Sequence, residues 1–285
     1  MKNHTLAFFI LLAAILFSGK LQAQVLPPDT SMKDIGVAVS PAHLTFNVKP
    51  GESKVQEVTV TNETRVKRSF KISMKDFDMD KSGRSTFLHA DSGKHSLSKW
   101  TNLSPTFFEL APGTAQKVRV TVNIPDTEGS NKAVWNAIWV EEAKERQVLE
   151  TEASDQKIAF GITPVFAFGV WVYQNPPNVA NKKVEIKNFT LQVNSESKSK
   201  SIELTLVNIG DGIAQCNAYV ELTNTNTGKT QRLLVKRFTI LPGYTRNYLF
   251  NLPDKLDKGN YDAVGVLDYG SKEEVIAAEL KFKIE

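Results

Sequence analysis

Cysteine and histidine are scarce in this chain, whose 285 residues include one cysteine, Cys216, and four histidines. A single cysteine cannot close an internal disulfide, so hydrophobic cores must hold the fold together. The chain also lacks a Ser nucleophile elbow, a phosphate-binding Gly-rich loop and the ligand spacing of a zinc site. We therefore predict a protein that is not an enzyme, with no catalytic residue, no metal and no cofactor.

Strong charge of one sign is also missing. The formal net charge is +4, and Lys2 and Lys20 of the leader contribute two of these charges. The remaining chain is close to neutral, which gives no reason to expect nucleic acid as a partner.

The longest uninterrupted apolar run is short and lies at the N-terminus. Leu6 to Phe17 follows Lys2 and precedes small residues that end at Ala23. About a dozen apolar residues are too few to span a bilayer and are typical of a signal peptide. We predict cleavage near Ala23 and a periplasmic mature chain that does not insert into the membrane.

Three Pro-Gly pairs introduce strand-like segments: Pro50-Gly51, Pro112-Gly113 and Pro242-Gly243. Proline presets φ at the second turn position, and glycine tolerates the positive φ of the third. The segments that follow alternate with a period of two, and no window shows a sustained helical period. The pattern predicts an all-β fold of short antiparallel strands.

Two prolines between asparagines, Asn175 to Asn178, indicate a stiff connector between two domains. We predict two immunoglobulin-like β-sandwich domains in tandem after a cleaved signal peptide. The predicted parts are a signal peptide (1–23), a polar lead (24–34), an N-terminal immunoglobulin-like domain (35–174), a linker (175–180) and a C-terminal immunoglobulin-like domain (181–285).

Each domain has seven predicted strands, the number in an immunoglobulin-like sandwich. In the first domain they are 37–47, 53–62, 68–77, 106–110, 115–124, 133–141 and 158–173. In the second they are 184–193, 201–207, 215–224, 232–238, 244–252, 259–267 and 274–284.

Two segments have weak features of metal sites. Asp78 to Gly83 resembles the start of a calcium loop, but the twelfth position is His89, where a bidentate Glu is required, so a hairpin turn is favoured. His89 and His95 flank Asp91, yet this Ser/Gly/Lys-rich segment is typical of a solvated loop.

Two tryptophans, Trp135 and Trp139, share one face of a predicted strand. They are expected to be core or rim aromatics rather than a sugar-stacking platform.

The segment from Ile158 to Val172 is unusual because every even position is apolar, while the first odd positions are small or polar. Bulky groups on one face alone suit insertion into an open hydrophobic groove. The other interpretation is the last strand of the first sandwich, facing its own core. We favour the second interpretation for 166–172 and leave both open for Ile158, Phe160 and Ile162.

Four elements of the first domain carry a family resemblance. They are Val39-Ser40-Pro41, the Lys49-to-Glu52 turn before Val58–Asn62, Phe108–Gly113 before Val118–Val120, and Trp135–Val140. In these elements the chain resembles the PapD-like periplasmic chaperone superfamily, and the second domain is similar mainly in length and position. The resemblance implies two immunoglobulin-like domains set at an angle.

The resemblance also implies a chaperone that caps secreted β-rich subunits of pili or surface fibres by strand donation. In that family the last strand of the first domain completes the subunit's sandwich. Here the role would fall to Ile158, Phe160, Ile162 and Phe166.

Usher-type members of the family hold the subunit's C-terminal carboxylate with an Arg in the first strand and a Lys in the last. The nearest positions here carry Ala42 and His43 in the first strand and Thr163 to Val165 in the last. The carboxylate anchor is the point at which the chain departs from the family.

A structural or adhesive module at the cell surface is the alternative function, as in WxL-interacting proteins that carry this type of domain. It would use the same strands as ordinary core. Exposure on intact cells would favour this module, and a free periplasmic pool would favour the chaperone.

Overall fold

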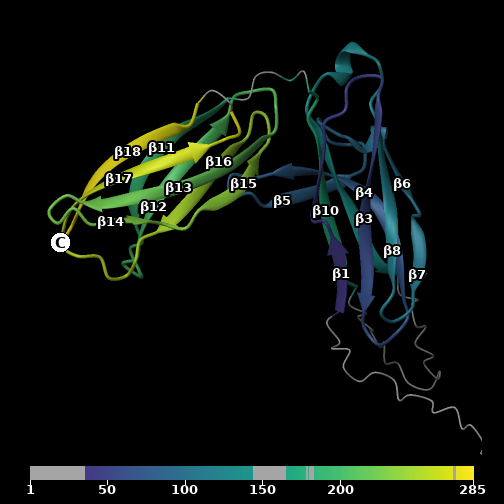
Figure 1. Cartoon of the computed structure of the whole chain (residues 1–285), viewed down its shortest axis with the longest axis horizontal. Helices are drawn as coiled ribbons and strands as arrows, with labels where there is room; N and C mark the ends of the chain where they lie inside the picture. Colours follow the sequence, from purple (N-terminus) through teal and green to yellow (C-terminus); the bar gives the residue numbers. More distant parts are fainter. Residues whose placement is uncertain (1–35, 144–164, 178, 180–182, 272–273) are drawn as a thin grey trace, which may run out of the picture.

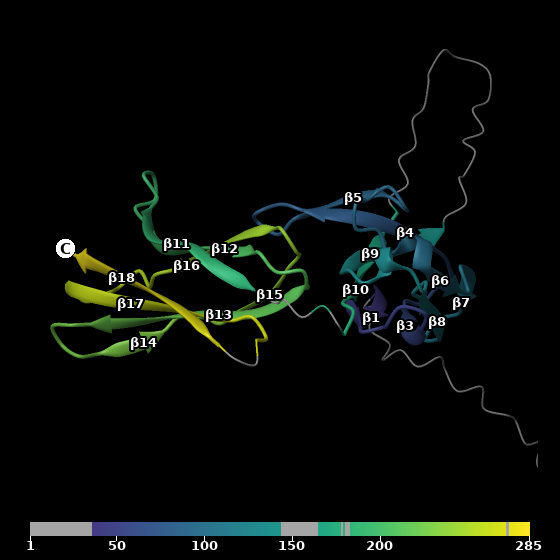
Figure 2. The same ribbon diagram turned by 90° about the horizontal axis from the view of Figure 1, so that it is seen from above.

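The computed structural model describes residues 36–143, 165–177, 179, 183–271 and 274–285. Across these residues the chain forms strands β1 to β18 and two short 3-10 turns, η1 (Ser98–Trp100) and η2 (Glu128–Ser130). Figures 1 and 2 show two β lobes, one built from β1 to β10 and the other from β11 to β18, whose strands run in different directions.

The first lobe has two sheets. The smaller sheet has the order β1-β3-β8-β6, and the larger has the order β2-β10-β9-β4-β5, with β7 also paired to β4. The strands are β1 (Gly36–Ser40), β2 (His43–Phe46), β3 (Ser53–Glu63), β4 (Arg68–Met79), β5 (Ser85–His89), β6 (Thr101–Ser104), β7 (Phe107–Leu110), β8 (Ala115–Asn123), β9 (Val134–Ala143) and β10 (Ala167–Gln174).

This order is that of an immunoglobulin sandwich, in which strands A, B, E and D face strands C, F and G. The first strand is divided between the two sheets. Its first part, β1, pairs with β3, whereas its second part, β2, runs parallel to β10. Pro41, which has no N–H to donate, lies at the switch.

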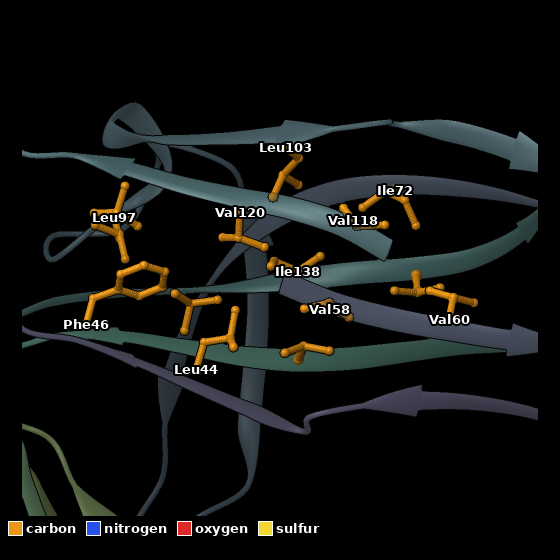
Figure 3. Close-up of a cluster of buried hydrophobic side chains, with 14 of the residues drawn as sticks. Leu44, Phe46, Val58, Val60, Ile72, Leu97, Leu103, Val118, Val120 and Ile138 are labelled. Carbon is orange, nitrogen blue, oxygen red and sulfur yellow. The ribbon is translucent and has the colours of Figure 1, made fainter. Parts of the chain in front are cut away.

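Alternating apolar side chains of both sheets meet in the core of the first lobe (Figure 3). Val58 and Val60 of β3, Val118 and Val120 of β8 and Ile138 of β9 are fully buried there. Successive side chains of a strand point to opposite faces, so one face of each strand reaches the core.

The second lobe is also a two-sheet sandwich, with a sheet of order β11-β12-β16 facing one of order β14-β13-β17-β18, and β15 paired to β13. The strands are β11 (Val184–Val193), β12 (Lys200–Asn208), β13 (Ala214–Asn224), β14 (Thr230–Arg232), β15 (Lys236–Ile240), β16 (Thr245–Asn251), β17 (Gly259–Asp268) and β18 (Ile276–Ile284). The predicted fold class, two immunoglobulin-like sandwiches in tandem, is confirmed.

Several strand predictions need correction. The predicted strand 37–47 is two strands, β1 and β2, and 232–238 spans β14 and β15, which pair with different parts of β13. The strands β5 and β6 were not predicted, because each is short and each is bordered by polar or proline residues. Of the predicted strand 158–173, residues 167–173 lie in β10, Val165 and Phe166 precede it, and Ile158, Phe160 and Ile162 lie outside the described residues.

Truncating Ile138 to alanine is expected to lower the free energy of unfolding of the first lobe by about 2–5 kcal/mol, because the lost side chain leaves a cavity in a closed core. Val66→Ala is the control, since Val66 lies between β3 and β4 of the same lobe and is 56% exposed; its effect should stay within about 0.5 kcal/mol. Urea unfolding followed by tryptophan fluorescence measures the difference, and equal effects of the two substitutions would contradict the packing described here.

Candidate functional site

Strand β10 has one edge that is paired along its whole length and another that is paired along half of it. Ala167 to Gln174 pairs with β9, and the parallel β2 pairs with Trp171 to Gln174. Hydrogen bonds in an antiparallel ladder alternate between the two edges of a strand. The carbonyl of Phe166 accepts from the N–H of Glu142 of β9 at 3.1 Å, whereas the N–H of Trp171 donates to Ala42 at 3.0 Å.

It follows that the main-chain groups of Ala167 and Gly169 point away from β9. Among the described strands, none pairs with β10 on that side before Trp171. An open stretch of this kind is a template for an added strand. We refer to Phe166–Gly169 as the open edge.

Burial increases along the chain through the open edge into β10. Phe166 is 63% exposed, Phe168 is partly buried against the first core, and Val170 and Val172 are buried in it. The interpretation of 166–172 as a strand facing its own core is thus confirmed for Val170 and Val172, whereas Phe166 projects from the sandwich. An exposed phenylalanine beside unpaired main-chain groups is the combination that strand addition uses.

A partly buried ion pair links β4 to β9, the strand next to the open edge. Arg68 of β4 donates to Glu142 of β9, whose side chain is 8% exposed, and the Nε of Arg68 donates to Thr64 at 3.1 Å. Because removing one partner of a buried pair leaves the other charge unpaired, this pair constrains β4 and β9 at the end where Phe166 emerges.

The first-strand position nearest the family's carboxylate anchor is held by an aromatic cluster. The ring of His43 lies 5.5 Å from that of Trp171 and 6.2 Å from that of Tyr173. The Ala42 carbonyl is occupied by the Trp171 N–H. Of the candidate last-strand positions, Thr163 and Pro164 lie outside the described residues, and Val165 is exposed.

The hairpin of β4 and β5 extends from the first lobe to the second (Figures 1 and 2). We call residues 75–89 the hairpin arm. The Tyr244 hydroxyl donates to Asp78, the carbonyl of Lys81 accepts from the N–H of Asn247 at 2.7 Å, and an Arg246 Nη1 lies 2.8 Å from the Met79 sulfur. These contacts attach the arm to β16 and the turn before it.

An apolar cluster lies between the two lobes beneath the arm. It comprises Phe77, Ala133, Trp135, Ala137 and Tyr173 of the first lobe with Ile213 and Leu241 of the second. Trp135 is buried and donates to the Phe77 carbonyl at 3.0 Å, so the expectation that it is a core aromatic is confirmed. Burial raises the pKa of Tyr173 to about 12, partly opposed by a hydrogen bond from Thr239 and by the charge of Arg246.

The residues at the predicted domain connector make specific contacts. The Asn175 N–H donates to Phe46 of β2 at 2.9 Å, and its side-chain oxygen accepts from the Ile213 N–H at 3.2 Å. Asn175 therefore contacts both lobes.

The two weak metal motifs form turns and loops. The Asp80 N–H donates to the Arg84 carbonyl at 3.0 Å and closes the β4–β5 turn, so the predicted hairpin turn is confirmed. The segment after His89 is a loop, as predicted, but it is tied to the sheet by Asp76, which accepts from Gly93, Ser96 and Ser98.

His95 packs against the first lobe. Its ring stacks on Trp135 at 4.5 Å, and burial lowers the pKa of His95. Within the described ranges, no group of three His, Cys, Asp or Glu side chains could hold a metal ion. The same ranges contain no helix with the length and apolar character that a membrane crossing requires.

Sequence comparisons find no relative for this chain. No family model matches it, and no curated protein matches it.

Solved structures similar to the chain include several chaperones. The class 5 fimbriae chaperone CfaA is 13% identical with a TM-score of 0.43, covering 86% of this chain and 98% of that one. The CsuC-CsuE chaperone-tip adhesion subunit complex of Acinetobacter baumannii is 15% identical with a TM-score of 0.44, covering 85% and 97%. The E. coli chaperone DraB is 15% identical with a TM-score of 0.41, covering 86% and 98%.

The thiol of Cys216 is expected to resist alkylation in the folded protein. Cys216 is 2% exposed in the second core, and burial raises its pKa to about 12, so the reactive thiolate is scarce at pH 8. Iodoacetamide followed by mass spectrometry should label less than about a tenth of the folded chains in the time that labels all of them in 8 M urea. Equal labelling rates in the two conditions would contradict this burial.

Proposed function

We propose that this chain is a non-enzymatic periplasmic chaperone that binds and caps secreted β-rich subunits of pili or surface fibres. The observation that carries the proposal is the open edge, where the main-chain groups of Ala167 and Gly169 face away from β9 beside the exposed Phe166. A client strand laid along this edge would gain ladder hydrogen bonds, and the client's groove would take up the apolar side chains.

The side chains proposed to enter the client are Ile158, Phe160, Ile162 and Phe166. Burying four such side chains contributes on the order of 6–12 kcal/mol before costs. Ordering the partner and the donor segment offsets part of this gain.

The localisation belongs to the same proposal. Residues 1–23 have the pattern of a signal peptide, so the mature chain would work in the periplasm, where subunits arrive unpaired. Because their edges expose unpaired main-chain groups, such subunits aggregate unless another strand covers them.

Replacing Phe160 or Phe166 with aspartate should reduce capture of secreted subunits at least tenfold, because a charge would have to enter an apolar groove. Phe107→Asp is the matched control, since Phe107 is 57% exposed on β7, on the opposite side of the larger sheet. Each variant is purified from the native periplasm, and bound proteins are identified and quantified by mass spectrometry. Full capture by both the Phe160→Asp and Phe166→Asp variants, with the mature chain displayed on intact cells, would favour the surface module instead.

Replacing Ala167 with proline tests the main-chain part of the interaction. Proline removes the outward N–H of residue 167 and leaves the ladder to β9 intact, because residue 167 does not donate to β9. We expect capture to fall at least tenfold with little change in melting temperature. Ala167→Val keeps the N–H and should capture normally, so equal capture by the proline and valine variants would argue against strand pairing at this edge.

A further inference from the structure

A cavity of about 650 Å³ lies between the two lobes, and residues of both lobes line it. This volume is within the range of about 300–1,000 Å³ that small organic ligands occupy in proteins. Its walls come from β2 and β10, from the hairpin arm, and from β13, β15 and β16; they include His43, Thr45, Gly83, Ser85, Trp171, Tyr173, Gln215, Arg237, Phe238, Thr239, Arg246 and Tyr248.

Arg246 is the main feature of this cavity because its guanidinium is buried and no described residue provides a counter-ion for it. The residue is 7% exposed, and within the described part of the chain its guanidinium forms no ion pair. Among the described residues its guanidinium donates to neutral groups, the Tyr248 hydroxyl at 2.5 Å and the Met79 sulfur at 2.8 Å, and its Nε has no partner. A buried cation without an anion is costly, so the site is electrostatically incomplete.

The rest of the lining carries positive charge and hydrogen-bond donors. Arg237 is a second cation, and none of the described residues that line the cavity is an aspartate or a glutamate. Ser85 and Gln215 add side-chain donors. A guanidinium in such surroundings matches a carboxylate, whose two oxygens can accept two parallel N–H bonds.

Aromatic rings supply the apolar part of the cavity. Trp171 and Tyr173 line it from the first lobe, and Phe238 and Tyr248, whose ring centroids are 4.1 Å apart, line it from the second. Flat apolar walls beside a cation suit a ligand with an apolar body and one negative end.

We propose that this cavity binds a small organic carboxylate, with its anionic end on Arg246 and its apolar body against the aromatic rings. Such a ligand supplies the missing counter-ion of Arg246. Because the walls come from both lobes, it also links them and favours the arrangement in which the hairpin arm lies on β16. The proposal does not depend on strand pairing at the open edge, and Ala167→Pro should leave ligand binding unchanged.

The test compares N-acetylphenylalanine with N-acetylphenylalaninamide on the full mature chain by titration calorimetry. The two probes share an aromatic body and differ in the carboxylate, so the acid is expected to bind at least ten times more tightly than the amide. Arg246→Gln should weaken binding of the acid at least tenfold. Arg232→Gln is the control and should bind normally, since Arg232 is exposed and paired with Glu221.

A second arginine variant covers the case in which Arg246→Gln does not fold, and a peptide probe distinguishes a free acid from a chain end as the ligand. If Arg246→Gln fails to fold, Arg237→Gln is used; it removes an exposed lining cation and should weaken the acid about threefold. A tripeptide ending in phenylalanine shows whether the carboxylate is a free acid or a chain end, and binding of either supports the site. No binding of any acid at 10 mM, equal binding of acid and amide, or unchanged affinity in both arginine variants would overturn the proposal.

Discussion

The hydrogen bonding of β10 is the constraint on which the rest of the first lobe depends. A strand has two edges, and each buried main-chain group on either edge needs a partner. β9 supplies partners along one edge of the whole strand, whereas β2 supplies them on the other edge only from Trp171 onward. The division of the first strand at Pro41 creates this difference, because β1 leaves the larger sheet to pair with β3. The open edge is therefore a consequence of the topology.

The same topology places the cavity at the far end of β10. Trp171 and Tyr173 point away from the first core and toward the second lobe, since they alternate with the buried Val170 and Val172. One strand thus contributes main-chain groups to the open edge at its start and aromatic side chains to the cavity at its end. The two proposed sites use different parts of the strand and different chemistry, so each can be altered without removing the other.

The sequence was sufficient for most of the fold, since the Pro-Gly turns and period-two segments identify nearly all strands of both sandwiches. β5 was not predicted, because its five residues Ser-Thr-Phe-Leu-His are too few to show a period-two pattern of polar and apolar side chains. β1 and β2 were predicted as one strand, because the alternation of their side chains continues across Pro41. Phe166 belongs to the apolar series that the sequence shows, but the favoured interpretation placed residues 166–172 against their own core, and its exposure of 63% was not predicted. Arg246 could not be identified from the sequence, because its burial depends on Met79 and Gly83, which are more than 160 residues away and belong to the other lobe. Contacts between lobes leave no periodicity in the sequence.

Both the local turn and the contact with Arg246 require glycine at position 83. Its φ of +87° lies in the region that favours glycine, as the hairpin turn needs. A Cβ at this position would also lie 2.0 Å from an Nη2 of Arg246, so the guanidinium occupies the space that any other residue would fill. A side chain there would strain the turn and displace the buried guanidinium of Arg246. Two requirements therefore fix glycine at the tip of the hairpin arm: the positive φ of the turn and the space that the Arg246 guanidinium occupies. A turn of the first lobe thus helps to set how the arm packs against the second lobe.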